Sequence, residues 1–413
     1  MKNKNFTISI EEAQKIILGS VNPLGFENVS IMDAFNRVLY ENIISDIMLP
    51  PVDNSAMDGY AIIADDTRGA AKNNPIKLQI IGEIQAGGPI IDKQVTQGTA
   101  IRIMTGAPMP DGADSVIQFE DTEEDGAHVK IFRETAKYEN YRFAGTNIKK
   151  GDTLLQKGDR LKSADVGILA SLNRSVVKVY KQPTVSIIST GDELADIGEE
   201  IKAGQIRNVN AYTLYSEIKK YNALPYYLGI TKDTLKDTKE IFLKALKSDV
   251  VISTGGVSMG KYDFVKEIYS DLNIEMLFER IKVKPGKPCT FGKKDNKLFF
   301  GLPGNPVSTL TSFIQFVRPA LLKLMGAKKI NKPIVNAFLE EDINKQSGRV
   351  FLARGYFTIK NNEFYVLPAT DNRDSSVLRS MSDANCLIVI PENITKVKAG
   401  EKVAIQLIEH DEI

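Results

Sequence analysis

Hydrophobic and polar positions follow one pattern in two separate parts of the chain and a different pattern in the part between them. From residue 51 to 145, short apolar runs such as "KLQIIGEI" and "SVIQFE" alternate with turns rich in glycine and proline. Long helical periods are absent there, which predicts a small β domain. Residues 327–413 return to short runs such as "VFLARGYFT" and "CLIVIP", which predict a second β domain.

Between these parts, residues 177–326 alternate strand-like and helix-like runs. "TVSIIST", "LPYYLGI", "DVVISTGG" and "KLFFG" are typical of buried strands, whereas "AYTLYSEIKKYN" and "TLKDTKEIFLKALK" have helical periods. This order predicts right-handed βαβ units and a doubly wound, mostly parallel sheet. The expected fold class is therefore α/β plus all-β, with residues 1–50 and 146–176 as a further, linking domain.

Local signals near the N-terminus predict two helices and no export. Ser9 and Glu12 have the spacing of a capping box ahead of an amphipathic run, and "MDAFNRVL" predicts a second helix. Glu11 and Glu12 interrupt any apolar signal segment. The uncharged run Leu298–Val317 is long enough to cross a bilayer, but Pro303–Pro306 breaks it, which favours a strand, a turn and a helix.

Composition excludes several classes of protein. Among 413 residues, 53 basic and 52 acidic side chains leave a net charge of +1, so no basic surface for nucleic acid is expected. The two cysteines, Cys289 and Cys386, lie in apolar runs typical of buried, reduced thiols, which fits a cytoplasmic protein. With only two histidines, His128 and His410, neither a histidine-based triad nor a histidine-rich metal site is expected.

Four turns follow the four expected parallel strands, and each carries polar or acidic side chains. Ligands of open α/β sheets bind outside the carboxyl ends of the strands, so these turns are expected along one edge. They are Ser189–Glu193, Gly229–Asp233, "STGGVSMGKYDF" with Asp263, and Gly301–Pro306. Their N–H groups, hydroxyls and carboxylates predict a phosphate site with room for Mg²⁺, which prefers oxygen ligands.

Two further patterns bear on the chemistry. The chain lacks the Gly-x4-Gly-Lys-Ser/Thr spacing of a P-loop and a well-placed Gly-x-Gly-x-x-Gly, so nucleotide hydrolysis and NAD binding lose support. Lys284 and Lys287 stand between prolines in "KPGKP", where fixed cations suit a phosphate or an oxyanion. From the residues alone, a solvated turn explains these two lysines equally well.

Eight stretches, taken in order, resemble the molybdopterin molybdenumtransferase family of molybdenum-cofactor biosynthesis, to which the C-terminal domain of gephyrin is related. They are "DNSAMDGYA", "RIMTGAPMPDGAD", "AGTNIKKGD", "ISTGDEL", "GQIRNVNAYTL", "ISTGGVSMGKYDFV", "VKPGKPCTFG" and "GLPGNPVST". Their shared order over most of the chain makes them far more specific than any one alone. "GRVFLARG" and "ANCLIVIPE" are less distinctive matches to the last domain of the family.

The resemblance implies an elongated homodimer of four-domain subunits with an active site at the dimer interface. It implies an enzyme that inserts molybdenum from molybdate into the dithiolene of adenylylated molybdopterin and releases AMP in a Mg²⁺-dependent step. The expected upstream partner is the molybdopterin adenylyltransferase, and molybdoenzymes or carriers would receive the product. Neither nucleic acid nor a membrane is an expected partner.

The resemblance also assigns roles by position. The family's catalytic residues match Asp58, Thr105, Glu193, Asp233, Asp263 and Lys284. Of these, Asp58 and Thr105 would face the partner subunit's cleft, and Glu193, Asp233 and Asp263 would hold the metal. The residues expected to bind the pterin and its phosphate are Thr190, Gly191, Ser253, Gly255, Gly256, Ser258, Lys287, Pro303 and Asn305. Lys284 and Lys287 would form the molybdate pocket, with Arg280 as a further candidate.

Two other functions stay open. The related adenylyltransferase, which consumes ATP and releases pyrophosphate, has a similar α/β domain, although the two extra β domains argue against it. A non-catalytic carrier or scaffold would bind molybdopterin without needing Glu193, Asp233 and Asp263.

Overall fold

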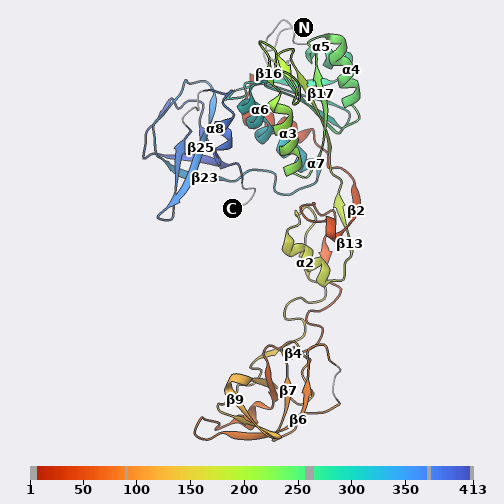
Figure 1. The fold of residues 1–413 in the computed structure, drawn as a ribbon, viewed down its shortest axis with the longest axis vertical. Helices are drawn as coiled ribbons and strands as arrows, with labels where there is room; N and C mark the ends of the chain where they lie inside the picture. The colour runs from red at the N-terminus through yellow and green to blue at the C-terminus, as the bar shows by residue number, and fades with distance from the viewer. Residues whose placement is uncertain (1–6, 89–91, 256–264, 370–373, 410–413) are drawn as a thin grey trace. The chain divides into compact units, whose positions relative to one another are not determined.

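The structure, a computed structural model, describes residues 7–88, 92–255, 265–369 and 374–409 (Figure 1). The chain divides into two compact units. The larger unit comprises Met1–Glu41, Lys157–Val166 and Val176–Ile413, and the smaller unit comprises Asn42–Gln156 and Gly167–Ser175.

A seven-stranded sheet forms the centre of the larger unit. In spatial order its strands are β1 (Thr7–Ile8), β19 (Glu275–Ile281), β21 (Pro288–Lys294), β22 (Lys297–Leu302), β18 (Val250–Thr254), β14 (Thr184–Thr190) and β17 (Leu224–Thr231). Strand β21 is antiparallel to both of its neighbours, and the other pairings are parallel. The predicted mostly parallel α/β sheet is confirmed.

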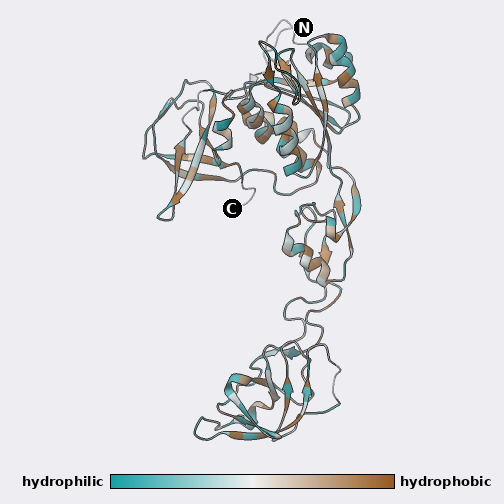
Figure 2. Ribbon diagram, in the orientation of Figure 1, coloured by the Kyte–Doolittle hydropathy of each residue, from teal (hydrophilic) through white to brown (hydrophobic). Residues whose placement is uncertain are grey.

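Helices cover both faces of this sheet. Successive residues of β14 pack into different cores. Ile187 belongs to the core on one face of the sheet. The helices of that core are α1 (Ile10–Gly19), α3 (Val209–Lys220), α6 (Pro306–Ser312), the π-helical η4 (Phe313–Val317) and α7 (Arg318–Leu324). Ile188 joins the core with α4 (Leu235–Ala245) and α5 (Val265–Asp271). Strands buried on both faces are continuously apolar, and Figure 2 shows them largely brown.

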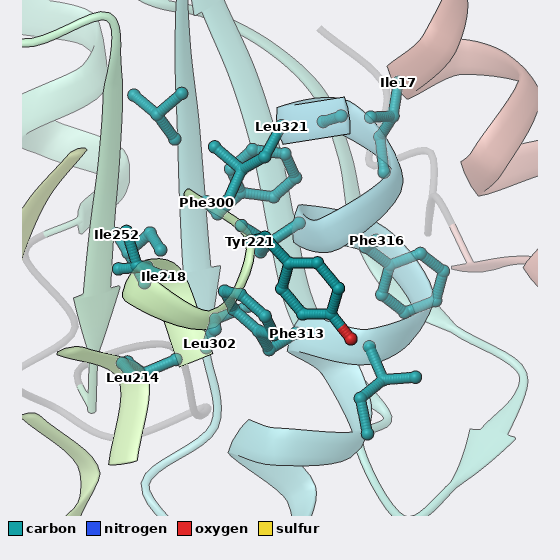
Figure 3. Close-up of a cluster of buried hydrophobic side chains, with 14 of the residues drawn as sticks. Ile17, Leu214, Ile218, Tyr221, Ile252, Phe300, Leu302, Phe313, Phe316 and Leu321 are labelled. Atoms are coloured by element: carbon teal, nitrogen blue, oxygen red, sulfur yellow. The ribbon is translucent and has the colours of Figure 1, made fainter. Parts of the chain in front are cut away.

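Aromatic and aliphatic side chains fill the first of these cores (Figure 3). The Tyr221 ring, just after α3, packs against Phe313 at a centroid distance of 6.3 Å. Leu214 and Ile218 of α3 are fully buried beside them. Helix α3 is therefore fixed against the sheet along its length.

Two local predictions are confirmed, one for the capping box near the N-terminus and one for the uncharged run Leu298–Val317. Ser9 Oγ accepts a hydrogen bond from the Glu12 N–H, and Glu12 Oε2 accepts one from the Ser9 N–H, which is a complete capping box. The run Leu298–Val317 forms β22, a turn and then α6 and η4. Across the described residues, no helix combines the length and apolar character needed to span a bilayer.

The prediction of a helix at "MDAFNRVL" is wrong. Strand β2 (Phe26–Ser30) leads into a single 3₁₀ turn, Ile31–Asp33. Asn36 then adopts a left-handed φ of 68°, and its N–H donates to Leu161 O. Because the Leu39 N–H also donates to Asp159 O, residues 159–161 satisfy polar backbone groups that a helix would have satisfied internally.

The C-terminal residues of the larger unit form a closed β barrel. Its strands are β25 (Val350–Lys360), β26 (Glu363–Pro368), β23 (Ile334–Leu339), β29 (Lys402–Leu407) and β27 (Cys386–Ile390), and β27 pairs with β25 to close it. The short strand β20 (Val283–Lys284) pairs in parallel with β25 and so ties "VKPGKP" to the barrel. Cys386 in the barrel and Cys289 in the central sheet are both buried as predicted, and burial raises the pKa of each thiol to about 12.

The smaller unit contains a six-stranded sheet. Its strands, in spatial order, are β8 (Ser115–Gln118), β5 (Gly59–Ile62), β7 (Thr99–Ile103), β6 (Ile76–Ile84), β10 (His128–Ile131) and β9 (Thr122–Asp125). Strands β6 and β7 are parallel, whereas the other pairings are antiparallel. One core lies on each side, around Tyr60 and around Ala61.

Candidate functional site

The four polar turns predicted from the sequence follow β14, β17, β18 and β22, which are adjacent parallel strands of one sheet. The strand ends approach one another closely. Gly255 has a left-handed φ of 83°, and a Cβ there would lie 2.3 Å from Thr190 O. The Gly255 N–H also donates to Leu302 O at 3.3 Å. Only glycine allows this contact, so the turn after β18 can sit against both neighbouring strand ends.

Two hydroxyls lie buried at these strand ends. Thr190 closes β14 and Ser253 lies near the end of β18. Thr190 Oγ1 and Ser253 Oγ are both buried without a hydrogen-bond partner in the described part of the chain. Because buried polar atoms are normally hydrogen-bonded, these two hydroxyls favour a polar ligand at this edge.

Carboxylates lie in the turns after β14 and β17. Asp192 and Glu193 belong to the first turn and Asp233 to the second, and we call these two turns the acidic turns. The Asp233 N–H donates to Asp192 Oδ1 at 3.3 Å. Burial raises the pKa of Asp233, and the negative charges of Asp192 and Glu193 raise it further. At Gly191, which has a φ of 145°, a Cβ would lie 2.5 Å from Glu193 Oε2, so this glycine admits the carboxylate.

The predicted metal ligands are only partly described. Within residues 7–88, 92–255, 265–369 and 374–409, no three histidine, cysteine or acidic side chains converge as a metal site. Asp263, Gly256 and Ser258 lie outside the described residues. The acidic turns offer only oxygen donors, which suits Mg²⁺, an ion that usually keeps several waters and one or two carboxylates.

On the other side of β18, four cations line a pocket of about 390 Å³, which we call the cationic pocket. They are Lys284, Lys287, Arg349 and Arg354. The polar groups beside them come from Asn305, Ser308 and Ser375, and the described lining includes no carboxylate. This arrangement favours an anion.

Two domains position the cations. Lys284 lies on β20, which pairs with β25 of the barrel, and its Nζ is 5.7 Å from the centroid of Phe351. Gly286, with a φ of 103°, presses the Lys-Pro-Gly-Lys turn onto α6, since a Cβ there would lie 2.9 Å from Ser312 Oγ. Lys287 follows on the same turn, so both lysines project from a firmly packed segment.

Arg354 is almost completely buried in the barrel wall, at 1% exposure. Its Nε donates to Ser380 Oγ at 3.1 Å, and its Nη2 donates to Asp374 O at 2.9 Å. The guanidinium is thus held in one orientation where it lines the pocket.

The turn after β22 forms another wall of the pocket. Thr309 Oγ1 donates to Pro303 O at 2.6 Å, and Asn305 Nδ2 donates to Ser375 Oγ at 2.8 Å. Arg280 lies on β19 opposite Pro288 and does not line the pocket, so the structure gives no support to it as an oxyanion ligand.

In the smaller unit, Asp58 and Thr105 come together as a pair. Asp58 Oδ1 accepts hydrogen bonds from the N–H of Thr105 at 2.6 Å and from its Oγ1 at 2.8 Å. These bonds, the backbone one first, lower the pKa of Asp58. The carboxylate is exposed and stays ionised at neutral pH.

Sequence reasoning missed part of the cationic pocket. Arg349, Arg354 and Ser375 lie beyond residue 327, in a domain for which the pattern predicts only short strands. The stretch "GRVFLARG" contains both arginines and is the signal that could have indicated them. Asp192 lies in a predicted turn but is not among the predicted site residues.

Comparison with known families covers nearly the whole chain. Residues 8–173 match the MoeA N-terminal region (domain I and II), residues 186–323 match a probable molybdopterin binding domain, and residues 336–408 match the MoeA C-terminal region (domain IV).

Individual relatives agree with these matches. The molybdopterin molybdenumtransferase of Staphylococcus epidermidis is 35% identical over 407 residues, which cover 98% of this chain and 97% of the relative. The enzyme of the same name from Haemophilus influenzae is 36% identical over 409 residues, covering 98% and 99%. The crystal structure of a molybdopterin biosynthesis moeA protein from Pyrococcus horikoshii OT3 superposes with a TM-score of 0.83 at 33% identity, covering 97% of this chain and all of that one.

Proposed function

The chain belongs to the molybdopterin molybdenumtransferase family, and on that premise we propose that it inserts molybdenum from molybdate into adenylylated molybdopterin and releases AMP. It is a transferase of molybdenum-cofactor biosynthesis. The observation that carries the proposal is the separation of charge along one sheet edge, with the acidic turns on one side of β18 and the cationic pocket on the other.

The cationic pocket is the proposed molybdate site. Molybdate is a divalent oxyanion, and the pocket offers ammonium and guanidinium donors with hydroxyl and amide groups beside them. Charge-assisted hydrogen bonds to oxyanions are roughly twice as strong as neutral ones. Lys287 and Arg354 approach from different domains, so an oxyanion between them would be held from two sides.

The acidic turns are the proposed place for Mg²⁺, with Glu193 and Asp233 as ligands and Asp263 completing the set. When bound, Mg²⁺ would neutralise phosphate charge during phosphoanhydride cleavage. Burial raises the pKa of Asp233, and repulsion from Asp192 and Glu193 raises it further; this repulsion supports the assignment, because a cation would relieve it.

The glycine turn after β18 is the proposed phosphate cradle. Gly255 brings this turn against β14 and β22, and the unpartnered hydroxyls of Thr190 and Ser253 lie beside it. These two hydroxyls would donate hydrogen bonds to the phosphate or to the pterin ring of the substrate. Gly191, Gly256 and Ser258 would complete the cradle. In this proposal the cradle, which follows β18, would hold the pterin phosphate between the acidic turns and the cationic pocket.

The finer features implied by the family complete the proposal. The protein would act as a cytoplasmic homodimer in which Asp58 and Thr105 serve the partner subunit's cleft. Their mutual hydrogen bonds support a preorganised, ionised carboxylate for that role. An adenylyltransferase would supply the intermediate, and carriers or molybdoenzymes would receive the product.

The decisive experiment measures AMP release from adenylylated molybdopterin and Mg²⁺, with and without micromolar molybdate. Molybdate-dependent release, with a product that reconstitutes a cofactor-free molybdoenzyme, is the expected result. Tight binding without release in either condition would replace the transferase with a carrier or scaffold. Pyrophosphate release from ATP and molybdopterin would instead indicate the adenylyltransferase.

A further inference from the structure

Asn210, in the first turn of α3, contacts a wall of the cationic pocket from behind. Its side chain is 8% exposed, and its Nδ2 donates to Gly304 O at 2.7 Å. The amide must have this orientation, because the reverse would place two acceptor oxygens against each other. Gly304 and Asn305 line the pocket, whereas α3 contributes none of its described lining residues.

The bond to Gly304 O fixes the direction of a neighbouring donor. The Gly304 carbonyl and the Asn305 N–H belong to one planar trans peptide, so they point in opposite directions. With the carbonyl turned toward α3, the Asn305 N–H is directed away from α3, a helix that contributes none of the described residues lining the pocket. This N–H has no acceptor within the part of the chain that the structure describes.

We infer that Asn210 is a positioning residue that orients the Gly304–Asn305 peptide so that the Asn305 N–H donates to the oxyanion. The inference rests on the proposed function of the cationic pocket. It adds to the four cations a neutral, directional donor held by a residue outside the pocket. A fixed N–H of this kind stabilises an anion without having to reorient when the anion binds.

Helix α3 is a suitable support because it is anchored independently of the turn. Asn208, its N-cap residue, donates from Nδ2 to Ser189 Oγ at 3.0 Å and to Tyr227 Oη at 2.8 Å. Buried side chains then hold the helix against the sheet. The helix therefore positions the turn, and the turn does not position the helix.

The test is a calorimetric titration of inorganic molybdate into the purified full-length protein. Asn210→Ala removes the donor, and we expect the molybdate Kd to rise about tenfold. Asn210→Asp keeps the shape but sets a carboxylate against Gly304 O, and we expect a loss at least as large. Alanine suits the first turn of a helix, so the melting temperature of Asn210→Ala should stay near that of the wild type, whereas the buried carboxylate of Asn210→Asp should lower it.

Thr213→Val is the matched control on the same helix. Among the described residues, Thr213 Oγ1 donates only to Val209 O and Asn210 O, both in α3, so its loss should leave the molybdate Kd unchanged. In the AMP-release assay, Asn210→Ala should raise the KM for molybdate while kcat at saturation is kept. A general loss of structure would lower kcat as well.

Two outcomes would overturn the inference in distinguishable ways. If the wild type binds molybdate and Lys287→Ala weakens binding, but both Asn210 variants bind normally, Asn210 has no positioning role and the proposed pocket stands. If the wild type binds no molybdate, or Lys287→Ala binds as well as the wild type, the proposed pocket fails and the role of Asn210 fails with it.

Discussion

The acidic turns and the cationic pocket flank the same strand, β18, yet they are built in different ways. The acidic turns come from consecutive βα units of one sheet, and burial together with the charges of Asp192 and Glu193 raises the pKa of Asp233. The cationic pocket combines turns of that sheet with the wall of a separate barrel. Repulsion between carboxylates is tolerated where a cation is expected, whereas in the cationic pocket hydrogen bonds to Ser380 and Asp374 hold Arg354 in place. The difference suggests that the first region depends on a bound ion and the second on domain docking.

The largest expected effect tests the acidic turns. Asp233→Asn should lower Mg²⁺-dependent AMP release by about 10²-fold, because a neutral amide is a poor Mg²⁺ ligand. Asp263→Asn should have the same effect and keep the fold. Single-turnover AMP release across a Mg²⁺ titration measures both. An unchanged rate for either variant would remove that residue from the mechanism.

The turn between the two regions is tested by Gly255→Ala. A Cβ 2.3 Å from Thr190 O and a left-handed φ should cost about 2–3 kcal/mol of unfolding free energy. Gly304→Ala is the control, because a Cβ there meets nothing within 4 Å and its φ is not left-handed. Chemical denaturation of both variants compares them. Equal midpoints would show that the strand ends can separate without cost.

The cationic pocket is tested by Lys287→Ala. Loss of one charge-assisted hydrogen bond should raise the KM for molybdate about tenfold and leave the Mg²⁺ dependence unchanged. Lys282→Ala is the control, because Lys282 is an exposed lysine nearby that pairs with Glu392 at 3.7 Å and does not line the pocket. Similar KM values for the two variants would place molybdate elsewhere.

The smallest expected effect is on stability in metal-free buffer. Because the folded state raises the pKa of Asp233, its ionised form is destabilising, and stability should increase as the pH falls through that raised pKa. Asp233→Asn should therefore raise the melting temperature slightly at pH 7, because solvent screens this partly exposed carboxylate, and less at low pH. Thermal melts at two pH values measure this. If Asp233→Asn melts at a lower temperature than the wild type at pH 7, the ionised Asp233 carboxylate does not destabilise the folded state.

Much of the larger unit could be predicted because local chemistry and global fold agree there. The capping box of Ser9 and Glu12 formed, and the apolar runs became strands buried on both faces. Prediction failed at "MDAFNRVL", where backbone pairing with residues 159–161 overrode a helical period. That contact joins segments at least 120 residues apart, so no local pattern could reveal it.

The sequence by itself determined the α/β class and the polar turns at one sheet edge, because strand periodicity and the carboxyl-end rule depend only on local order. It also placed Lys284 and Lys287 on one turn but left open whether that turn binds an anion. Tertiary structure alone brings Arg349, Arg354 and Ser375 of the barrel to the same pocket, and this arrangement favours an anion there. It likewise set Asn210 behind Gly304. Such contacts depend on how helices and domains pack, which periodicity along the chain does not encode.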